Sequence, residues 1–191
     1  MTKKGLLEIF STLEDPRMEN KISHKMIDIV VIAVCGTLCG AESWTEIELF
    51  GQEKEEWLRK YLELPNGIPS HDSFRYFFMK LDPHQFQRCF IEWTSELREE
   101  FEGEGISIDG KTVRHSYDNF KGQGAIHMVS AWANENEIVL GQIKVDEKSN
   151  EITAIPQLLQ ALDLRGCIVT MDAMGCQKEI IKEVRGQDAE Y

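Results

Sequence analysis

The spacing of apolar residues changes once along this chain of 191 residues, at about residue 102. Before that point apolar side chains recur at helical spacing, as Leu6, Ile9, Phe10 and Leu13 do. After it, short apolar runs either alternate with polar residues or are wholly apolar, which is typical of β-strands. The change predicts an all-helical N-terminal domain over residues 1–102, followed by an α/β (α+β) domain over residues 103–191.

The helical part contains recognisable start and stop signals. Residues 23–39 are apolar almost all round, which predicts a buried central helix. Ser43, with Glu46 three residues later, predicts a capped helix over 44–50, and Ser70 predicts another over 71–81. Further helices are expected over 53–62 and from 83 to about 100. The acidic, glycine-spaced residues 102–105 are expected to form a linker.

The second part predicts a mixed sheet packed against helices. Strands are expected over 106–109, 125–133 and 138–145, the last two joined as a hairpin. A helix over 152–162 follows, in which Pro156 is tolerable only in the first turn. A strand over 167–171 and a helix over 178–184 complete the order.

Composition and charge exclude some classes of protein. The net charge of −12 argues against coating nucleic acid by bulk attraction, although it permits a local basic groove or carboxylates that hold cations. The most apolar run, residues 26–40, is too short to span a membrane. Five cysteines, an odd number, fit a reducing compartment better than a disulfide framework. With no signal-peptide pattern at its start, the chain is expected to be cytoplasmic, with no membrane partner.

Two aspartates follow directly after predicted strands. Asp109 ends the run Ile-Ser-Ile-Asp and is followed by Gly110, and Asp172 ends the apolar strand over 167–171. A single aspartate in such a place more often caps a strand or the next helix. If the two strands are neighbours, however, two like charges meet at one edge of the sheet, and a Mg²⁺ or Mn²⁺ ion would offset their repulsion. The pair therefore predicts a metal site suited to phosphodiester cleavage.

Several motifs together carry a resemblance to a known family. They are IDGKTVR at 108–114, EKSNEI at 147–152 with IP at 155–156, TMDAMGCQ at 170–177, DPR at 15–17 and IPSHDSF at 68–74. With these motifs, nearly the whole chain resembles the insertion-sequence transposases of the H-repeat-associated type. That family belongs to the DDE class, in which a helical region precedes an RNase H-like core.

The resemblance implies a DDE-type transposase that cleaves and transfers DNA strands with Mg²⁺ or Mn²⁺. Asp109 and Asp172 match the first two acidic residues of the triad and would be its catalytic metal ligands. The third acid of the family lies beyond Tyr191, and Glu179 and Glu183 follow Asp172 too closely to replace it. The chain is thus expected to be a truncated form with a partial, mixed-sheet RNase H-like core. DNA at transposon ends is the implied partner, and homo-oligomerisation is left open.

An alternative hypothesis is a catalytically silent transposase remnant that binds only DNA or a partner protein. A further one is a small regulator using the helical region alone. The charge of residues 1–100 counts against that regulator, since 12 Lys and Arg face 18 Asp and Glu.

Other residues have both a functional and a structural interpretation. Lys111 and Arg114 are candidate phosphate contacts, although solvated charges are the default for such a pair. Glu151 either faces the site as an auxiliary acid or only favours the start of a helix through its dipole. The helices over 43–81 either form a DNA reader with Arg75 and Lys80 exposed, or pack their aromatic side chains into a core. Those aromatic residues are Trp44, Phe74, Tyr76, Phe77 and Phe78.

Overall fold

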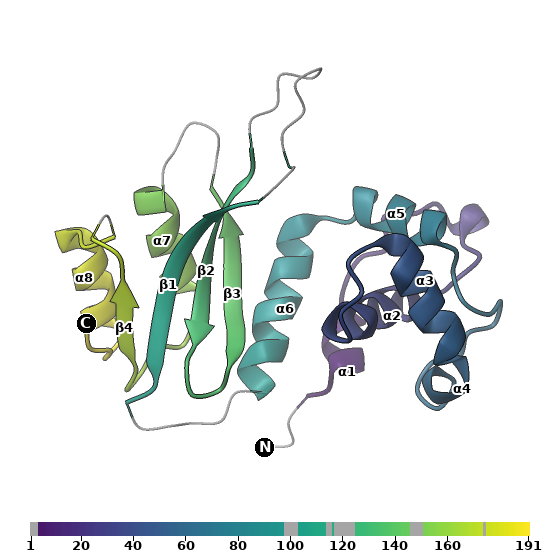
Figure 1. The fold of residues 1–191 in the computed structure, drawn as a ribbon, viewed down its shortest axis with the longest axis horizontal. Helices are drawn as coiled ribbons and strands as arrows, with labels where there is room; N and C mark the ends of the chain where they lie inside the picture. Colours follow the sequence, from purple (N-terminus) through teal and green to yellow (C-terminus); the bar gives the residue numbers. More distant parts are fainter. Residues whose placement is uncertain (1–3, 98–102, 114–115, 117–124, 146–150, 174) are drawn as a thin grey trace. The chain divides into compact units, whose positions relative to one another are not determined.

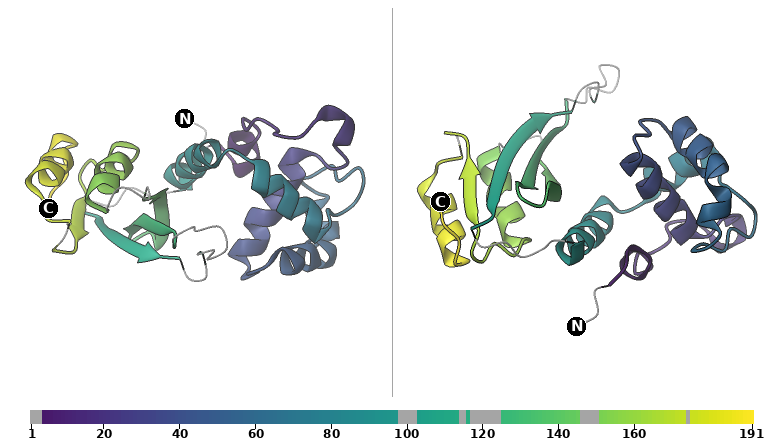
Figure 2. Two further views of the ribbon diagram at one scale, coloured as in Figure 1. Left: turned by 90° about the horizontal axis from the view of Figure 1, so that it is seen from above. Right: turned by 60° about the horizontal axis from the view of Figure 1, so that its bottom comes forward.

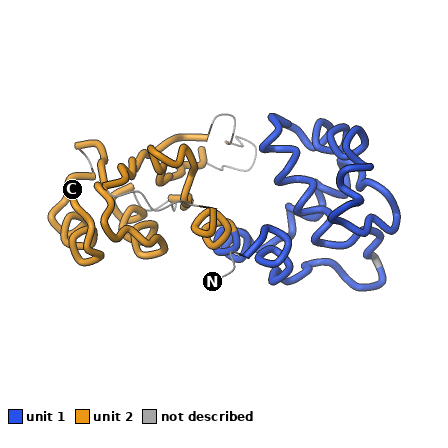
Figure 3. The backbone as a smooth tube through the Cα atoms, turned by 90° about the horizontal axis from the view of Figure 1, so that it is seen from below, with its two compact units in different colours: residues 1–89 blue, residues 90–191 orange. Residues whose placement is uncertain are grey.

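The computed structural model of the chain describes residues 4–97, 103–113, 116, 125–145, 151–173 and 175–191 (Figure 1). The chain forms two compact units, Met1–Cys89 and Phe90–Tyr191 (Figure 3). Helix α6 (Pro83–Leu97) begins in unit 1 and ends in unit 2. A helical region followed by a mixed α/β region is the fold class that the sequence predicts. None of the helices in the described parts is long and apolar enough to cross a membrane.

Unit 1 is helical, and its helices begin where the capping residues predict. They are α1 (Leu6–Phe10), a 3-10 helix (Glu19–Lys21), α2 (Met26–Leu38), α3 (Trp44–Glu53), α4 (Glu55–Leu58), α5 (His71–Lys80) and the start of α6. The hydroxyl of Ser43 accepts the backbone N–H of Glu46 at 3.3 Å, and that of Ser70 accepts the backbone N–H of Ser73 at 3.4 Å. Helix α2 is the predicted central helix, because most of its side chains are buried. The helix expected over 53–62 is shorter, since α4 ends at Leu58.

The aromatic residues of α5 divide between the core and the surface. Phe74 and Phe77 are fully buried, and Phe78 stacks on Trp44 with ring centroids 5.1 Å apart. These contacts favour the core interpretation for these four residues. Tyr76 differs, because it lies on another side of the helix and remains 55% exposed.

Asp28 is a buried carboxylate inside the core of unit 1. Only 1% of its surface is exposed, and its Oδ2 accepts the backbone N–H of Leu64 at 3.2 Å. Burial raises the pKa of Asp28, and the hydrogen bond from Leu64 opposes that rise only in part. Asp28 thereby attaches the turn after α4, where Leu64 has a positive φ of 44°, to the start of α2.

Unit 2 is built on a mixed sheet, four-stranded in its described part. The strands are β1 (Gly105–Thr112), β2 (His127–Ala133), β3 (Ile138–Lys144) and β4 (Ile168–Met171), in the order β3-β2-β1-β4. Strand β1 pairs antiparallel with β2 and parallel with β4, while β2 and β3 form the predicted antiparallel hairpin. Helix α7 (Glu151–Gln160) connects β3 to β4, and α8 (Lys178–Gly186) follows β4. This order agrees with the predicted one and with a partial RNase H-like core.

The two faces of the sheet differ in what they bury. Along β1, Ile106 and Ile108 point into the core, whereas Asp109 is exposed on the opposite face. Helices α7 and α8 lie together on the buried face (Figure 2). Leu158 of α7 and Val184 of α8 are fully buried there. The face that carries Asp109 is therefore the one turned away from these helices.

The expected linker at 102–105 is wrong for the residues that the structure describes. Glu104 is fully buried, and its carboxylate accepts the side-chain amide of Asn136 at 2.5 Å and the backbone N–H of Asn136 at 3.3 Å. Gly105 already belongs to β1. The charge can be buried because the β2–β3 turn folds back over it and supplies hydrogen-bond donors.

Pro156 also lies where the sequence did not predict it. It is the sixth residue of α7, inside the helix and beyond its first turn. The missing N–H removes one helical hydrogen bond, to the carbonyl of Ile152. The helix continues because its buried residues, among them Ile155 and Leu159, are held against the sheet.

Candidate metal centre

Two parallel strands bring Asp109 and Asp172 to the same end of the sheet. The register pairs Ile106 with Val169 and ends by pairing Ile108 with Met171. Asp109 and Asp172 are the next residues of their chains beyond that last pair. The expectation that these two strands are neighbours is therefore confirmed.

The side chains two residues before each aspartate show which face of the sheet the two positions share. The hydroxyls of Ser107 and Thr170 lie 3.3 Å apart on the face turned away from α7 and α8. Since side chains alternate along a strand, the positions of Asp109 and Asp172 belong to that same face. Both aspartates are exposed. Their carboxylates are thus available to a ligand in solution.

A tight turn orients Asp172. One of its carboxylate oxygens accepts the backbone N–H of Gly175 at 3.0 Å. A side chain at position 175 would require Met171 to move, because its Cβ would lie 2.8 Å from the sulfur of Met171. The turn therefore holds the Asp172 side chain beside its own backbone as the chain leaves β4.

Cys176 and Tyr191 are neighbours of this site that the sequence reasoning did not select. The pKa of the Tyr191 hydroxyl is raised, mainly by its hydrogen bond with the Cys176 thiol. Partial burial and the charge of Asp172 raise it further. Tyr191 reaches this place because the chain runs beside β4, where Glu190 forms a parallel bridge with Ile168. The motif around Asp172 contained Cys176, but no local pattern indicated Tyr191.

Glu151 lies against β1 next to Asp109. It is the first residue of α7, and its carboxylate takes the space that a side chain at position 110 would need. Gly110 has the same alternation as Ile106 and Ile108, so Glu151 approaches β1 from the side of α7. Glu151 therefore lies at a helix N-terminus and approaches β1 from the face opposite to that of Asp109, and its role as an auxiliary acid stays a prediction.

The basic candidates are only partly described. Lys111 is exposed and shares the alternation of Asp109, which puts both on one face of β1. Arg114 lies outside the described residues. His127 pairs its Nδ1 with the hydroxyl of Thr112 at 2.9 Å, which is a structural role.

Two exposed carboxylates at the ends of neighbouring strands provide the hard oxygen ligands that Mg²⁺ and Mn²⁺ prefer. Nothing in the described chain forms an ion pair with Asp109 or Asp172, so neither charge is already neutralised there. The described residues contain no group of three His, Cys, Asp or Glu placed to hold a metal ion. The arrangement fits an ion held by two protein carboxylates, with its remaining positions open to water or substrate.

Comparison with known proteins identifies the family. A family described as Transposase DDE domain matches residues 100–191, and one described as DDE_Tnp_1-associated matches residues 7–94. YncI of Escherichia coli O157:H7, named as a candidate transposase, is 49% identical over the whole chain, which covers 49% of YncI. YhhI of E. coli K12, named as an H repeat-associated candidate transposase, is 44% identical, and the chain covers 50% of it. YbfD of the same strain has the same kind of name and is 42% identical, with 76% of it covered.

The chain belongs to the H repeat-associated transposase family. Its match to the DDE domain includes Asp109 and Asp172, and its match to the associated domain includes the helices of unit 1. The chain spans about half the length of YncI from strain O157:H7 and of YhhI. No solved structure matches it at a significant level.

Proposed function

We propose that this chain carries the helical and catalytic parts of a DDE-type transposase, which cuts DNA at transposon ends and joins it to a new site. The parallel pairing of β1 with β4 supports this best, because it gives Asp109 and Asp172 adjacent positions on one exposed face. The chain covers only about half of its longer relatives, so the activity of the whole protein is part of this proposal.

Asp109 and Asp172 would hold Mg²⁺ or Mn²⁺ through their carboxylate oxygens. A bound ion of this kind activates an attacking oxygen and stabilises the leaving oxygen of a phosphodiester. The hydrogen bond from Gly175 orients the Asp172 carboxylate, and Glu151 adds negative charge behind Asp109. Lys111, on the same face as Asp109, and Arg114 would contact the DNA phosphates.

A DNA-binding protein without cleavage activity is the second candidate. The observation that favours it is that the described residues place two carboxylates, not three ligands, at this site. Such a protein would bind a cation weakly and still bind DNA through other surfaces. Cation binding and strand cleavage therefore need separate measurements.

The test of the metal site is a Mn²⁺ titration of the wild-type chain, Asp109→Asn and Asp172→Asn by calorimetry. Each substitution is expected to weaken Mn²⁺ binding more than about tenfold, because even residues behind a metal ligand contribute 10- to 100-fold. Glu179→Gln is the matched control, since Glu179 is exposed on α8 and pairs with Lys182 at 3.1 Å. Equal affinity in all four proteins would show that the two aspartates are not ligands.

A further inference from the structure

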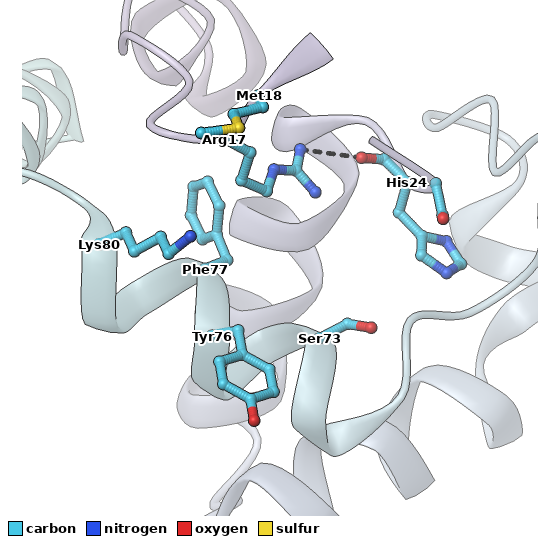
Figure 4. A pocket seen from close by; sticks show the side chains of 8 residues that line it. Arg17, Met18, His24, Ser73, Tyr76, Phe77 and Lys80 are labelled. Atoms are coloured by element: carbon cyan, nitrogen blue, oxygen red, sulfur yellow. Dashed lines mark hydrogen bonds between the residues drawn. The ribbon is translucent and has the colours of Figure 1, made fainter. Parts of the chain in front are cut away.

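A pocket in unit 1 lies between α5 and the chain that leads into α2 (Figure 4). Its volume is about 340 Å³, within the range of small-ligand sites. One wall is a single side of α5, with Ser73, Tyr76, Phe77 and Lys80 at helical spacing. The other wall contains Arg17 and His24. All of these residues belong to unit 1, so the pocket is formed by that unit alone.

The ionisable groups that line this pocket are basic. Arg17, His24 and Lys80 line it, and its lining contains no Asp or Glu, although the whole chain has a net charge of −12. Lys80 makes no ion pair with any residue that the structure describes. Its ammonium group is turned towards Phe77 in Figure 4. The pocket therefore offers positive charge that the described part of the protein does not neutralise.

Arg17 has a different role from Lys80, because it holds the pocket wall in place. Its Nε and Nη2 donate to the carboxylate of Asp15 at 2.9 and 2.7 Å, and Nη2 also donates to the carbonyl of His24 at 2.9 Å. Its guanidinium lies 5.3 Å from the centre of the Phe77 ring. Partial burial would raise the pKa of Asp15, but the hydrogen bonds from Arg17 outweigh it and lower that pKa. The wall is thus preorganised, and its remaining charge comes from Lys80.

An exposed aromatic residue, Tyr76, lies one helical turn before Lys80 on α5. Tyr76 is 55% exposed, whereas its neighbour Phe77 is fully buried. The guanidinium of Arg75 lies 4.6 Å from the centre of the Tyr76 ring. Met18, also in the lining, is 69% exposed. Aromatic rings beside basic side chains are the combination that binds single-stranded nucleic acid, since bases stack on the ring and phosphates meet the charge.

We propose that this pocket binds one unpaired nucleotide of a DNA strand, with its base on Tyr76 and its phosphate at Lys80. An unpaired nucleotide fits better than a duplex, because the faces of a base are accessible to a ring only when the base is unstacked. The inference rests on the proposed function only in taking DNA as the substrate. It needs neither a bound cation nor strand cleavage.

The test uses the full chain with EDTA present, and measures binding of a short single-stranded DNA by fluorescence anisotropy at several salt concentrations. Tyr76→Ala is expected to weaken binding roughly 5- to 100-fold, the usual effect of losing one stacked base. Lys80→Ala is expected to lower the slope of log affinity against log salt by about 0.7, the effect of losing one phosphate contact to a single strand.

Matched controls come from the same unit. Tyr61→Ala removes another exposed tyrosine, 59% exposed, and Lys60→Ala removes another exposed lysine; neither lines the pocket. Circular dichroism checks that each variant is folded. Loss of affinity confined to the Tyr76 and Lys80 variants supports the proposal. Absence of binding by the wild type, or equal effects in the controls, overturns it. Because EDTA removes any bound cation, a failure here differs from a failure of the metal site.

Discussion

Unit 1 and unit 2 place their carboxylates in contrasting surroundings. In unit 1, Asp28 is buried and accepts the backbone N–H of Leu64, which joins two distant segments. Unit 2 has a buried carboxylate of the same kind in Glu104, held by Asn136. Unit 2 alone adds the exposed pair Asp109 and Asp172 at the ends of parallel strands.

The contrast separates acids that hold the fold together from the pair that we propose to bind a metal ion. A buried carboxylate contributes to folding only when donors inside the protein satisfy it. Exposed carboxylates on a shared face contribute little to folding, and their mutual repulsion opposes it slightly. Their arrangement is better explained by a ligand than by stability. Substitutions that affect stability should therefore be separable from those that affect the metal site.

The largest expected effect comes from replacing the buried carboxylate of unit 2. Glu104→Ala should lower the free energy of unfolding by about 2 kcal/mol, because it removes a fully buried side chain that accepts two hydrogen bonds from the partly buried Asn136. Urea unfolding followed by circular dichroism measures the change. The matched control, Asp109→Ala, should change stability by less than about 0.5 kcal/mol, as exposed sites usually do. Equal losses in the two variants would remove the distinction between structural and functional acids.

A smaller effect is expected where a helix meets the candidate site. Gly110→Ala should lower stability by about 1 kcal/mol, because its methyl group would displace the Glu151 carboxylate, which is the end of a flexible side chain and can move aside. Glu151→Ala in the same chain should restore most of that loss, and the double-mutant cycle gives the coupling between the two positions. If Gly110→Ala lowers stability equally with and without the Glu151 side chain, the contact between residues 110 and 151 is not the cause of the loss.

The smallest effect concerns the buried carboxylate of unit 1. Because burial raises the pKa of Asp28, the ionised form opposes folding, and this penalty disappears as the pH falls below that pKa. Asp28→Asn keeps an oxygen for the Leu64 N–H and carries no charge. It should raise stability at neutral pH by less than about 1 kcal/mol, and the gain should shrink in acid. Urea unfolding of both proteins from neutral to acidic pH measures the gain in stability. A gain that does not vary with pH would show that the charge of Asp28 is not its cause.

The sequence was sufficient wherever local rules decide the structure. Hydroxyl caps predicted the starts of α3 and α5, and alternating or wholly apolar runs predicted the strands, so Asp109 and Asp172 could be selected from the sequence. The resemblance to H repeat-associated transposases is likewise confirmed. The division at residue 102 stays a prediction, since the contacts divide the chain within α6 and the family matches divide it between residues 94 and 100.

Features that depend on distant contacts were not predictable. The sequence predicted a linker at Glu104 because no residue near it in the chain indicates its hydrogen bond with the distant Asn136. Pro156 remains helical because the sheet holds its helix. The exposure of Tyr76 and the place of Glu151 behind Gly110 likewise follow from packing between elements.

The contact between the Ser107 and Thr170 hydroxyls joins positions 63 residues apart in the chain. Pairings over such separations form slowly, because the loop between them must first be ordered. An unfolded or half-folded chain therefore has two isolated aspartates and no place for an ion. A cation that binds only the folded chain stabilises it in proportion to the logarithm of its concentration. The proposed cation site then forms only when the chain folds, and a melting temperature that rises with Mn²⁺ concentration would be the measurable sign of this coupling.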